Sequence, residues 1–348
     1  MRIIKKEKTN IDEIVKVLKA DGLVIMPTET VYIAAVDATN PTAVKKLVKY
    51  KNRPFGKPFS VGVIDLEMAQ KYVEINETAL NLYKTFYPGP ITIVSNGKHK
   101  VAPEVESELG TLGIFITDHK LTIDVIKKLG KPITTTSANA SYQKRPFKIK
   151  DLLDFLSQKQ KNLIDLIVDY GEIPHREAST VIDTTIDDPA VLRQGEIKLK
   201  DKIELLSRNE ENTQNIGKEL WQKYNKYKNK RALVFALEGP MGAGKTQFTK
   251  GLARAMGIQE EVVSPTYDFE IEYDKKLTHI DVWRMKDSME LEELGFSKLI
   301  NDKSVLAIEW ADKVSEIIRK YNQDTIIIWI KIKYGNKDNE RLISWGVL

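Results

Sequence analysis

The segment GPMGAGKT at residues 239–246 limits the folds open to this 348-residue chain more than any other stretch. It fits the pattern G-x-x-x-x-G-K-[ST], with the lysine at Lys245 and the hydroxyl residue at Thr246. The apolar run ALVFALE before it predicts a buried strand, and KTQFTKGLARAMG after it predicts a helix that ends at its last glycine. Glycines let backbone N–H groups turn inward around an anion, and the start of a helix adds its dipole. The sequence therefore predicts a phosphate-binding loop between a strand and a helix.

Two further predicted strands end in carboxylates that suit such a loop. KKLTHIDVW ends near Asp281, and SVLAIEW ends near Glu309. In phosphate-binding loops the lysine neutralises the β- and γ-phosphates of ATP and the hydroxyl binds Mg²⁺. We expect Asp281 to hold Mg²⁺ through water and Glu309 to orient or activate the attacking water. The candidate ATP-binding residues here are Gly239, Gly242, Gly244, Lys245, Thr246 and Gln247, and the candidate metal-binding residues are Thr246, Asp281 and Glu309.

Length and local pattern predict two domains, because globular domains average about 150 residues. Apolar runs such as DGLVIMPT, ITIVSN and LIVDYG alternate with helical patterns in the first part, which favours an α/β fold with a twisted, mixed sheet. A polar, helical stretch at 207–230 then leads into the strand before the phosphate loop. We expect domains at 1–203 and 204–348, the second an α/β P-loop NTPase domain.

Composition excludes several classes of site. The chain has no cysteine, so it has no disulfide, no thiolate zinc site and no cysteine nucleophile, and its four histidines never stand at metal-ligand spacing. A net charge of +5 permits contact with RNA but does not by itself indicate it. No run of about 18 apolar residues is present, so we expect a cytoplasmic protein without a membrane partner.

Polar and basic side chains also gather where predicted elements of the first domain end. Cations suit phosphates, while hydroxyl and amide groups suit a ribose or an amino acid, so the set fits an adenylation site that uses ATP. No protein nucleophile is implied, and positioning and charge stabilisation would carry the reaction. The candidate residues are Thr28 and Thr30 after a strand, Lys51, Arg53 and Lys57 after a helix, Thr136, Ser137, Asn139 and Ser141 in a turn, and Ser179, Thr180 and Arg193 near two later strands.

The second domain resembles the TsaE (YjeE) family of bacterial P-loop ATPases. The resemblance is carried by GPMGAGKT, VVSPTYDFEIEY, THIDVWR, LEELGF and IEWADKV in this order, and it covers nearly all of 207–348. It implies ATP hydrolysis that supports threonylcarbamoyl transfer to tRNA by a TsaD/TsaB-type complex. It also implies that Glu309 and Trp310 form a catalytic pair and that Ser264, Pro265 and Thr266 match a switch-like segment.

The first domain resembles the TsaC/YrdC threonylcarbamoyl-AMP synthases through PTETVY, KNRPFGKPF, YPGPITIV, TSANAS, STVID and LRQGEI, over about 10–200. The resemblance implies that L-threonine, bicarbonate and ATP are joined into threonylcarbamoyl-AMP with release of pyrophosphate. It assigns Lys51 and Arg53 to catalysis. It assigns Lys51, Arg53, Lys57, Ser137, Asn139 and Arg193 to ATP, and Thr28, Thr30, Thr136 and Ser179 to threonine or the carbamate.

Two positions depart from that family's pattern. Ile33 stands where a glycine commonly follows PTETVY, and Phe115 stands where an arginine is usual. We expect Lys57, Lys144 or Arg145 to supply the missing charge.

The leading hypothesis is therefore a fused, bifunctional enzyme of tRNA threonylcarbamoyladenosine synthesis. One alternative is a carbamoyl-adenylate enzyme with a different acceptor, against which the absence of cysteine argues. The other is a decayed first domain that only binds nucleotide or RNA and is tethered to an active ATPase.

Overall fold

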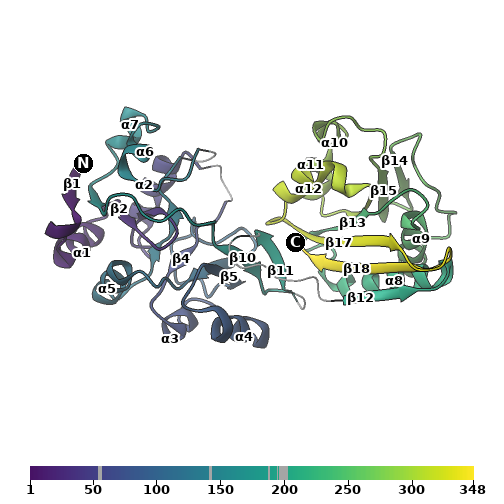
Figure 1. The fold of residues 1–348 in the computed structure, drawn as a ribbon, viewed down its shortest axis with the longest axis horizontal. Helices are drawn as coiled ribbons and strands as arrows, with labels where there is room; N and C mark the ends of the chain where they lie inside the picture. Colours follow the sequence, from purple (N-terminus) through teal and green to yellow (C-terminus); the bar gives the residue numbers. More distant parts are fainter. Residues whose placement is uncertain (54–56, 141–142, 187–188, 194, 196–202) are drawn as a thin grey trace. The chain divides into compact units, whose positions relative to one another are not determined.

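The computed structural model describes residues 1–53, 57–140, 143–186, 189–193, 195 and 203–348. The chain divides into two compact units, Met1–Lys198 and Leu199–Leu348, and each is an α/β unit, as predicted (Figure 1). No described helix is both long and apolar enough to cross a membrane. Some residues of the predicted motifs lie outside the described residues, namely Pro54, Phe55, Gly56, Ser141, Gln194, Glu196 and Ile197.

Unit 1 is built on two mixed sheets. The first has the order β1 (Arg2–Lys5), β9 (Leu166–Asp169), β2 (Val24–Pro27), β3 (Tyr32–Ala35), β8 (Thr136–Ser137). The second has the order β11 (Ala190–Arg193), β10 (Thr180–Asp183), β5 (Ile91–Asn96), β6 (Thr111–Phe115), β4 (Val61–Gly62), β7 (Ile133–Thr134). Parallel pairs such as β1–β9 and antiparallel pairs such as β2–β3 occur in one sheet, which confirms the predicted mixed sheet.

The helices of unit 1 begin and end where local sequence signals place them. The Asn40 side chain accepts hydrogen bonds from the backbone N–H groups of Thr42 and Ala43, and Pro41 opens the helix, as predicted. Gly130, at φ 71°, ends another helix in the left-handed region. The helices are η1 (Lys6–Lys8), α1 (Ile11–Lys19), α2 (Pro41–Lys51), α3 (Leu66–Gln70), α4 (Glu77–Phe86), α5 (Lys120–Leu129), α6 (Ile149–Leu153) and α7 (Gln158–Lys161).

Unit 2 is built on one seven-stranded sheet whose central strands are parallel. Its order is β12 (Ile203–Ser207), β18 (Arg341–Val347), β17 (Thr325–Tyr334), β13 (Ala232–Glu238), β16 (Val305–Glu309), β15 (Leu277–Asp281), β14 (Glu270–Tyr273). Strands β17, β13, β16 and β15 run parallel, so their carboxyl ends meet at one edge of the sheet. That edge carries the predicted phosphate loop.

Two helices pack closely beside this loop. The polar stretch forms α8 (Glu210–Tyr224), followed by η2 (Asn225–Tyr227), and α9 (Lys245–Ala255) begins at the loop lysine. A Cβ on Gly251 would lie 1.9 Å from the carbonyl oxygen of Gln214, and one on Gly217 would lie 2.4 Å from that of Phe248. The backbones of α8 and α9 therefore touch where only glycine fits.

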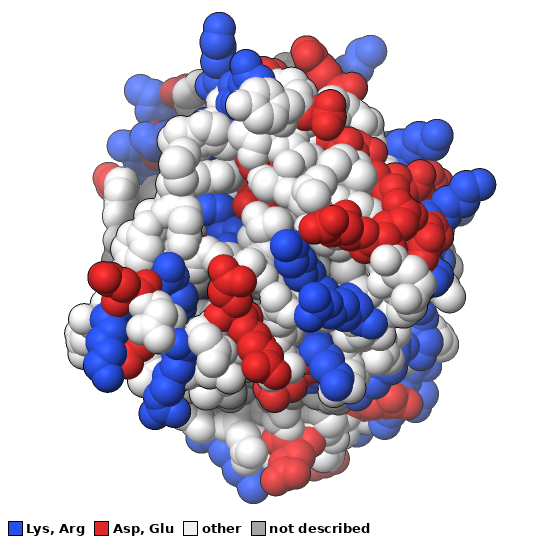
Figure 2. Space-filling view, turned by 90° about the vertical axis from the view of Figure 1, so that its right-hand side faces the viewer, with Lys and Arg blue, Asp and Glu red and all other residues white. Residues whose placement is uncertain are grey.

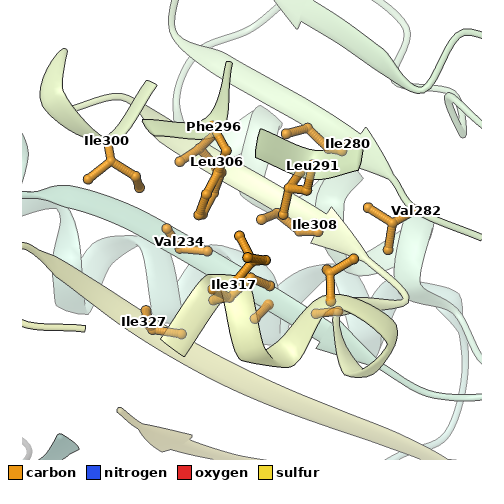
Figure 3. Packing of buried hydrophobic residues seen from close by; sticks show 14 of the residues in the cluster. Val234, Ile280, Val282, Leu291, Phe296, Ile300, Leu306, Ile308, Ile317 and Ile327 are labelled. Atoms are coloured by element: carbon orange, nitrogen blue, oxygen red, sulfur yellow. The ribbon is translucent and has the colours of Figure 1, made fainter. Parts of the chain in front are cut away.

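The main core of unit 2 fills the other face of the sheet. Val234, Ile280, Leu306 and Ile308 point toward Phe296 and the other buried side chains of the short helices that cover them (Figure 3). These helices are α10 (Met289–Glu293), α11 (Phe296–Asn301), η3 (Ala311–Val314) and α12 (Ser315–Lys320). Because side chains alternate along a strand, Asp281 and Glu309 project to the face that α9 covers.

Candidate functional site

The phosphate loop of unit 2 has the backbone that its glycines predict. Gly244, at φ 102°, immediately precedes α9, in a region that other residues rarely adopt. A Cβ on Gly239 would lie 2.4 Å from the carbonyl oxygen of Ile332, so the loop passes close to β17. The Arg341 guanidinium donates to the carbonyl oxygens of Gly242 and Ala243, each at 3.1 Å. Arg341 of β18 therefore holds the loop through its carbonyl oxygens and leaves the backbone N–H groups of the loop unengaged by this side chain.

Lys245 is folded back onto its own loop. Its Nζ donates to the carbonyl oxygens of Gly239 at 2.7 Å and Pro240 at 2.9 Å. The same atom lies 3.6 Å from the centroid of the Trp310 ring. Burial lowers the pKa of Lys245, and the carboxylates of Glu309 and Asp281 oppose that effect. In this conformation the Lys245 ammonium group is therefore hydrogen-bonded within its own loop.

Asp281 and Glu309 are neighbours across two parallel strands. Both are almost fully buried, at 2% and 3% exposed. The Thr246 hydroxyl donates to Glu309 Oε1 at 2.8 Å. Asp281 Oδ2 accepts from the hydroxyls of Thr266 at 2.7 Å and Ser264 at 3.1 Å, which joins the predicted switch-like segment to the site. The structure therefore brings all three candidate metal-binding residues to one strand edge.

These donors fit a nucleotide-bound Mg²⁺. In the described part of the chain, no group of three His, Asp or Glu side chains lies close enough to hold a metal. A cation here would need the Thr246 hydroxyl and phosphate oxygens beside one or two carboxylates, which is how Mg²⁺ is held in ATP-using sites. Oxygen atoms are the ligands that Mg²⁺ prefers, and Thr246, Asp281 and Glu309 supply them.

An aromatic pair lies beside the loop. The Trp310 and Trp283 rings are 4.3 Å apart at their centroids, and Lys313 Nζ lies 5.2 Å from the Trp283 ring. Trp310 has φ 62°, an uncommon value for a bulky residue, so the turn after β16 directs its ring toward Lys245. Gln247 points elsewhere, because its Oε1 accepts from Gln214 Nε2 at 2.7 Å on α8.

His279 is a site residue that the sequence did not reveal. Its side chain is fully buried, and its Nε2 lies 3.0 Å from Glu309 Oε1. The two-residue spacing between His279 and Asp281 on one strand was a signal, since alternate residues share a face of the sheet. That signal has meaning only when the register with β16 is known.

Unit 1 holds a buried cation at the end of α2. Lys51 is 3% exposed, and its Nζ donates to the carbonyl oxygens of Ser137, at 2.6 Å, and Asn139. Burial, with a smaller effect from the Arg53 charge, lowers the pKa of Lys51 to about 7. Asn139 Oδ1 is buried, and no described residue donates to it. The structure thus brings together three predicted ATP-binding residues, Lys51, Ser137 and Asn139.

Arg53 continues this cluster. Its Nε donates to the carbonyl oxygen of Lys57 at 3.0 Å, its guanidinium lies 4.5 Å from the Phe59 ring, and it also bonds the Pro58 carbonyl. The Lys57 residue is exposed. Thr136 pairs with Ala34 in the β3–β8 ladder, so it stands beside the cluster as part of the sheet.

A second cluster forms around the PTETVY turn. Thr28 Oγ1 donates to the carbonyl oxygen of Val31 at 2.8 Å, and it lies 3.3 Å from Thr30 Oγ1. The Arg145 guanidinium donates to the carbonyl oxygen of Thr30 at 3.1 Å. Of the three cations expected to compensate for Phe115, Arg145 is therefore the one that contacts a predicted threonine-binding residue in a described hydrogen bond.

A third cluster joins β10 and β11. Arg193 donates to the Ser179 carbonyl at 2.9 Å and to its Oγ at 3.0 Å, and Ser179 Oγ lies 3.5 Å from Thr92 Oγ1. Packing of the guanidinium and repulsion from Arg145 lower the pKa of Arg193 to about 10, although the residue as a whole is exposed. The repulsion means that Arg145 of the second cluster and Arg193 of the third are close enough to interact electrostatically.

The two departures from the family pattern are buried. Phe115, at 4% exposed, stands in β6 between Gly62 and Thr92, and Ile33, at 1% exposed, stands in β3. Neither side chain offers a charge. Glu29, which the sequence did not single out, accepts from the Thr117 hydroxyl, and burial raises the pKa of its carboxyl.

The face of the molecule that Figure 2 shows carries charges of both signs. Figure 2 shows lysine and arginine interspersed with aspartate and glutamate across one face. This view agrees with the mild net charge of +5 for the whole chain. Charge alone therefore gives this face no preference for nucleic acid.

Two family models match the chain, and the boundary between their matches lies close to the boundary between the two structural units. The model Sua5_yciO_yrdC, described as "Telomere recombination", matches residues 16–195. A second model, described as "Threonylcarbamoyl adenosine biosynthesis protein TsaE", matches residues 207–343. The first match covers more than half of the chain.

Known proteins resemble the first part most clearly. The chain is 31% identical over 207 residues to a "Putative threonylcarbamoyl-AMP synthase" of Methanocaldococcus jannaschii, covering 57% of this chain and 95% of the relative. It is 34% identical over 189 residues to the "Threonylcarbamoyl-AMP synthase" of Bacillus subtilis, covering 54% of this chain and 53% of that protein. A solved structure, "P. abyssi Sua5 complexed with L-threonine", aligns with a TM-score of 0.52 and 20% identity over 94% of this chain and 98% of that one. At that identity the structural likeness shows the fold alone.

Proposed function

Because the chain belongs to the Sua5/YciO/YrdC family and carries a TsaE domain, we propose that it is a bifunctional enzyme of tRNA threonylcarbamoyladenosine synthesis. In this proposal the synthase domain spans 1–203 and the ATPase domain spans 204–348. Making a labile acyl-adenylate on the chain that also carries the ATPase raises its effective concentration near the machinery that consumes it.

The synthase reaction joins three substrates. The α-amino nitrogen of L-threonine forms a bond to the carbon of bicarbonate, an oxygen of the resulting carbamate attacks the α-phosphorus of ATP, and pyrophosphate and water leave. We assign Lys51, Arg53 and Arg193 to the phosphates, where their charge stabilises the developing negative charge. Ser137, Asn139 and exposed Lys57 complete the ATP site, and Thr28, Thr30, Thr136 and Ser179 hold threonine or the carbamate.

The observation that best supports an ATP site in unit 1 is the burial of Lys51 at the Ser137–Asn139 turn. A buried ammonium group is stabilised when an anion arrives, and Lys51 Nζ is buried and donates to the carbonyl oxygens of Ser137 and Asn139. A phosphate beside Nζ supplies that anion. The site therefore favours a phosphate ligand over a neutral one.

In the ATPase domain we assign the loop residues Gly239, Gly242 and Gly244 with Lys245 to the phosphates. Thr246 and Asp281 hold Mg²⁺, which supplies charge neutralisation at the β- and γ-phosphates. Glu309 orients the attacking water and accepts its proton, and Trp310 covers Lys245 until nucleotide binds. We also assign Gln247, which is hydrogen-bonded to Gln214 of α8, to the ATP site. The partners in this proposal are TsaD/TsaB-type subunits, and tRNA reaches the chain directly or through them.

One assay tests the synthase half. Pyrophosphate release from ATP by the purified chain should require both threonine and bicarbonate, and Lys51→Ala should abolish it. Release that ignores either substrate would contradict the assignment. Reconstitution with TsaD/TsaB-type subunits and tRNA, using Lys51→Ala and Lys245→Ala separately, tests the coupling of the two halves.

The buried Phe115 supports a second candidate function. If the family's usual arginine is essential, unit 1 is a nucleotide- or RNA-binding module tethered to an ATPase. Absence of pyrophosphate release in the wild type, with restoration in Phe115→Arg, would favour this reading over the synthase.

A further inference from the structure

His279 lies behind the proposed catalytic carboxylate. It is the third residue of β15, its side chain is fully buried, and its Nε2 is 3.0 Å from Glu309 Oε1. The contact joins two adjacent strands, so it depends on their register rather than on a flexible loop. A histidine with this burial and this partner has a role tied to that carboxylate.

The register explains how the imidazole fits. Strand β15 pairs with β16 in parallel, with His279 opposite Ala307 and Asp281 opposite Glu309. The small Ala307 side chain leaves room on that face, so the imidazole reaches along the strand toward the next same-face residue, Glu309. The Tyr273 ring closes the other side, with centroids 6.5 Å apart.

The hydrogen-bond pattern gives the direction of the contact. His279 Nδ1 is buried, and no described residue bonds to it. A proton on Nδ1 would be a buried donor without an acceptor. An unprotonated Nδ1 is instead a buried acceptor without a donor, which costs less. The proton therefore belongs on Nε2, which donates to Glu309 Oε1.

Glu309 Oε1 accepts hydrogen bonds from two donors, one of which can change partners while the other cannot. The first is the Thr246 hydroxyl, which lies at the mouth of the loop and can turn toward a metal ion. His279 is enclosed between strands and cannot turn. When Thr246 changes partners, His279 is the donor that keeps the carboxylate in place.

We propose that His279 is a positioning residue that fixes Glu309 during ATP hydrolysis by holding Oε1, so that Oε2 faces the water. This inference rests on the proposed ATPase function of unit 2. It assigns His279 no contact with nucleotide, so its loss should lower kcat and leave nucleotide binding in place.

Three variants of the full chain test the proposal. His279→Leu keeps an apolar side chain and removes the donor, and should lower kcat for ATP hydrolysis about 10- to 100-fold with KM within about twofold. His279→Gln places an amide N–H near the position of Nε2 and should recover most of kcat. Thr249→Val is the matched control and should behave as the wild type, because Thr249 is equally buried in α9 and its hydroxyl, among the described residues, donates to the Lys245 carbonyl alone.

A spectroscopic readout needs neither activity nor metal. The chain has four histidines, so the side-chain nitrogen resonances of His279 are assigned by their disappearance in His279→Gln. In the nucleotide-free protein, Glu309→Gln should shift these resonances, and Thr249→Val should leave them unchanged. Resonances that do not respond to Glu309→Gln would overturn the proposal.

The kinetic outcomes separate this inference from the function it rests on. If Glu309→Gln hydrolyses ATP as fast as the wild type, the proposed catalytic role of Glu309 fails. If Glu309→Gln is slow but His279→Leu is normal, or if His279→Leu and His279→Gln lose kcat equally, the positioning role alone is wrong.

Discussion

The ammonium nitrogen of Lys245 lies 3.6 Å from the centroid of the Trp310 ring and donates to two carbonyls of its own loop. Phosphate binding must therefore move Lys245 away from bonds that it already makes. The nucleotide site is formed in outline, but its principal cation is engaged within the protein.

Nucleotide binding should change tryptophan emission. All five tryptophans follow residue 220, so emission reports on unit 2. We expect MgADP to change the emission of the wild type, because Lys245 leaves the Trp310 face. Trp310→Phe should lose more than half of that change, while the control Trp345→Phe should keep it. An equal response in both variants would show that Trp310 is not the main source of the emission change.

Lys245 and Glu309 should separate binding from turnover. Lys245→Ala removes the charge that meets the phosphates and should weaken ATP binding about 100-fold or more, measured by calorimetry on a Lys51→Ala background. Glu309→Ala should bind ATP normally and slow hydrolysis about 100-fold. Similar losses of binding in both variants would contradict the assigned roles.

Arg145 should carry the charge that Phe115 lacks. Its guanidinium donates to the Thr30 carbonyl and lies near Arg193, so Arg145→Ala should raise the KM for threonine about tenfold in the pyrophosphate assay. The neighbouring Lys144 is exposed, and Lys144→Ala should stay within about twofold of the wild type. A larger effect at Lys144 would move the compensating charge to that side chain.

ATP binding to unit 1 should take up a proton above neutral pH. Burial lowers the pKa of Lys51 to about 7, so at pH 8 the Lys51 side chain is mostly uncharged in the free protein. A bound phosphate favours the ammonium form and raises this pKa, so uptake at pH 8 should approach about one proton per ATP and fall toward zero below pH 6. Calorimetry of Lys245→Ala in buffers of different ionisation enthalpy measures this uptake, and adding Lys51→Met should abolish it. Proton release at pH 8 would reverse the predicted sign.

The glycine contact between α8 and α9 should not tolerate a methyl group. A Cβ on Gly251 would meet the Gln214 carbonyl, so Gly251→Ala should destabilise unit 2 by about 1–3 kcal/mol. Denaturant unfolding followed by tryptophan emission measures the loss. Lys250→Ala, at the preceding position of α9, should change the unfolding free energy by less than about 0.5 kcal/mol.

The sequence was sufficient where the determining interactions are local. The strand–loop–helix order around Lys245 follows from a motif and two neighbouring patterns, and Asn40 and Gly130 bound their helices through bonds a few residues away. Asp281 and Glu309 were also recognisable, because each ends an apolar strand.

The remaining features depend on contacts between distant segments. His279 meets Glu309 only through the register of β15 and β16, which no local pattern fixes. The burial of Lys51 depends on the distant Ser137–Asn139 turn, which its position at the end of a helix does not reveal. The Lys245–Trp310 contact requires the left-handed turn at Trp310, which is unusual for a tryptophan.

The touching backbones at Gly217 and Gly251 leave α8 and α9 no slack to slide past each other. The helix that begins at the phosphate loop is therefore in direct backbone contact with α8, and a displacement of α8 would act on it first.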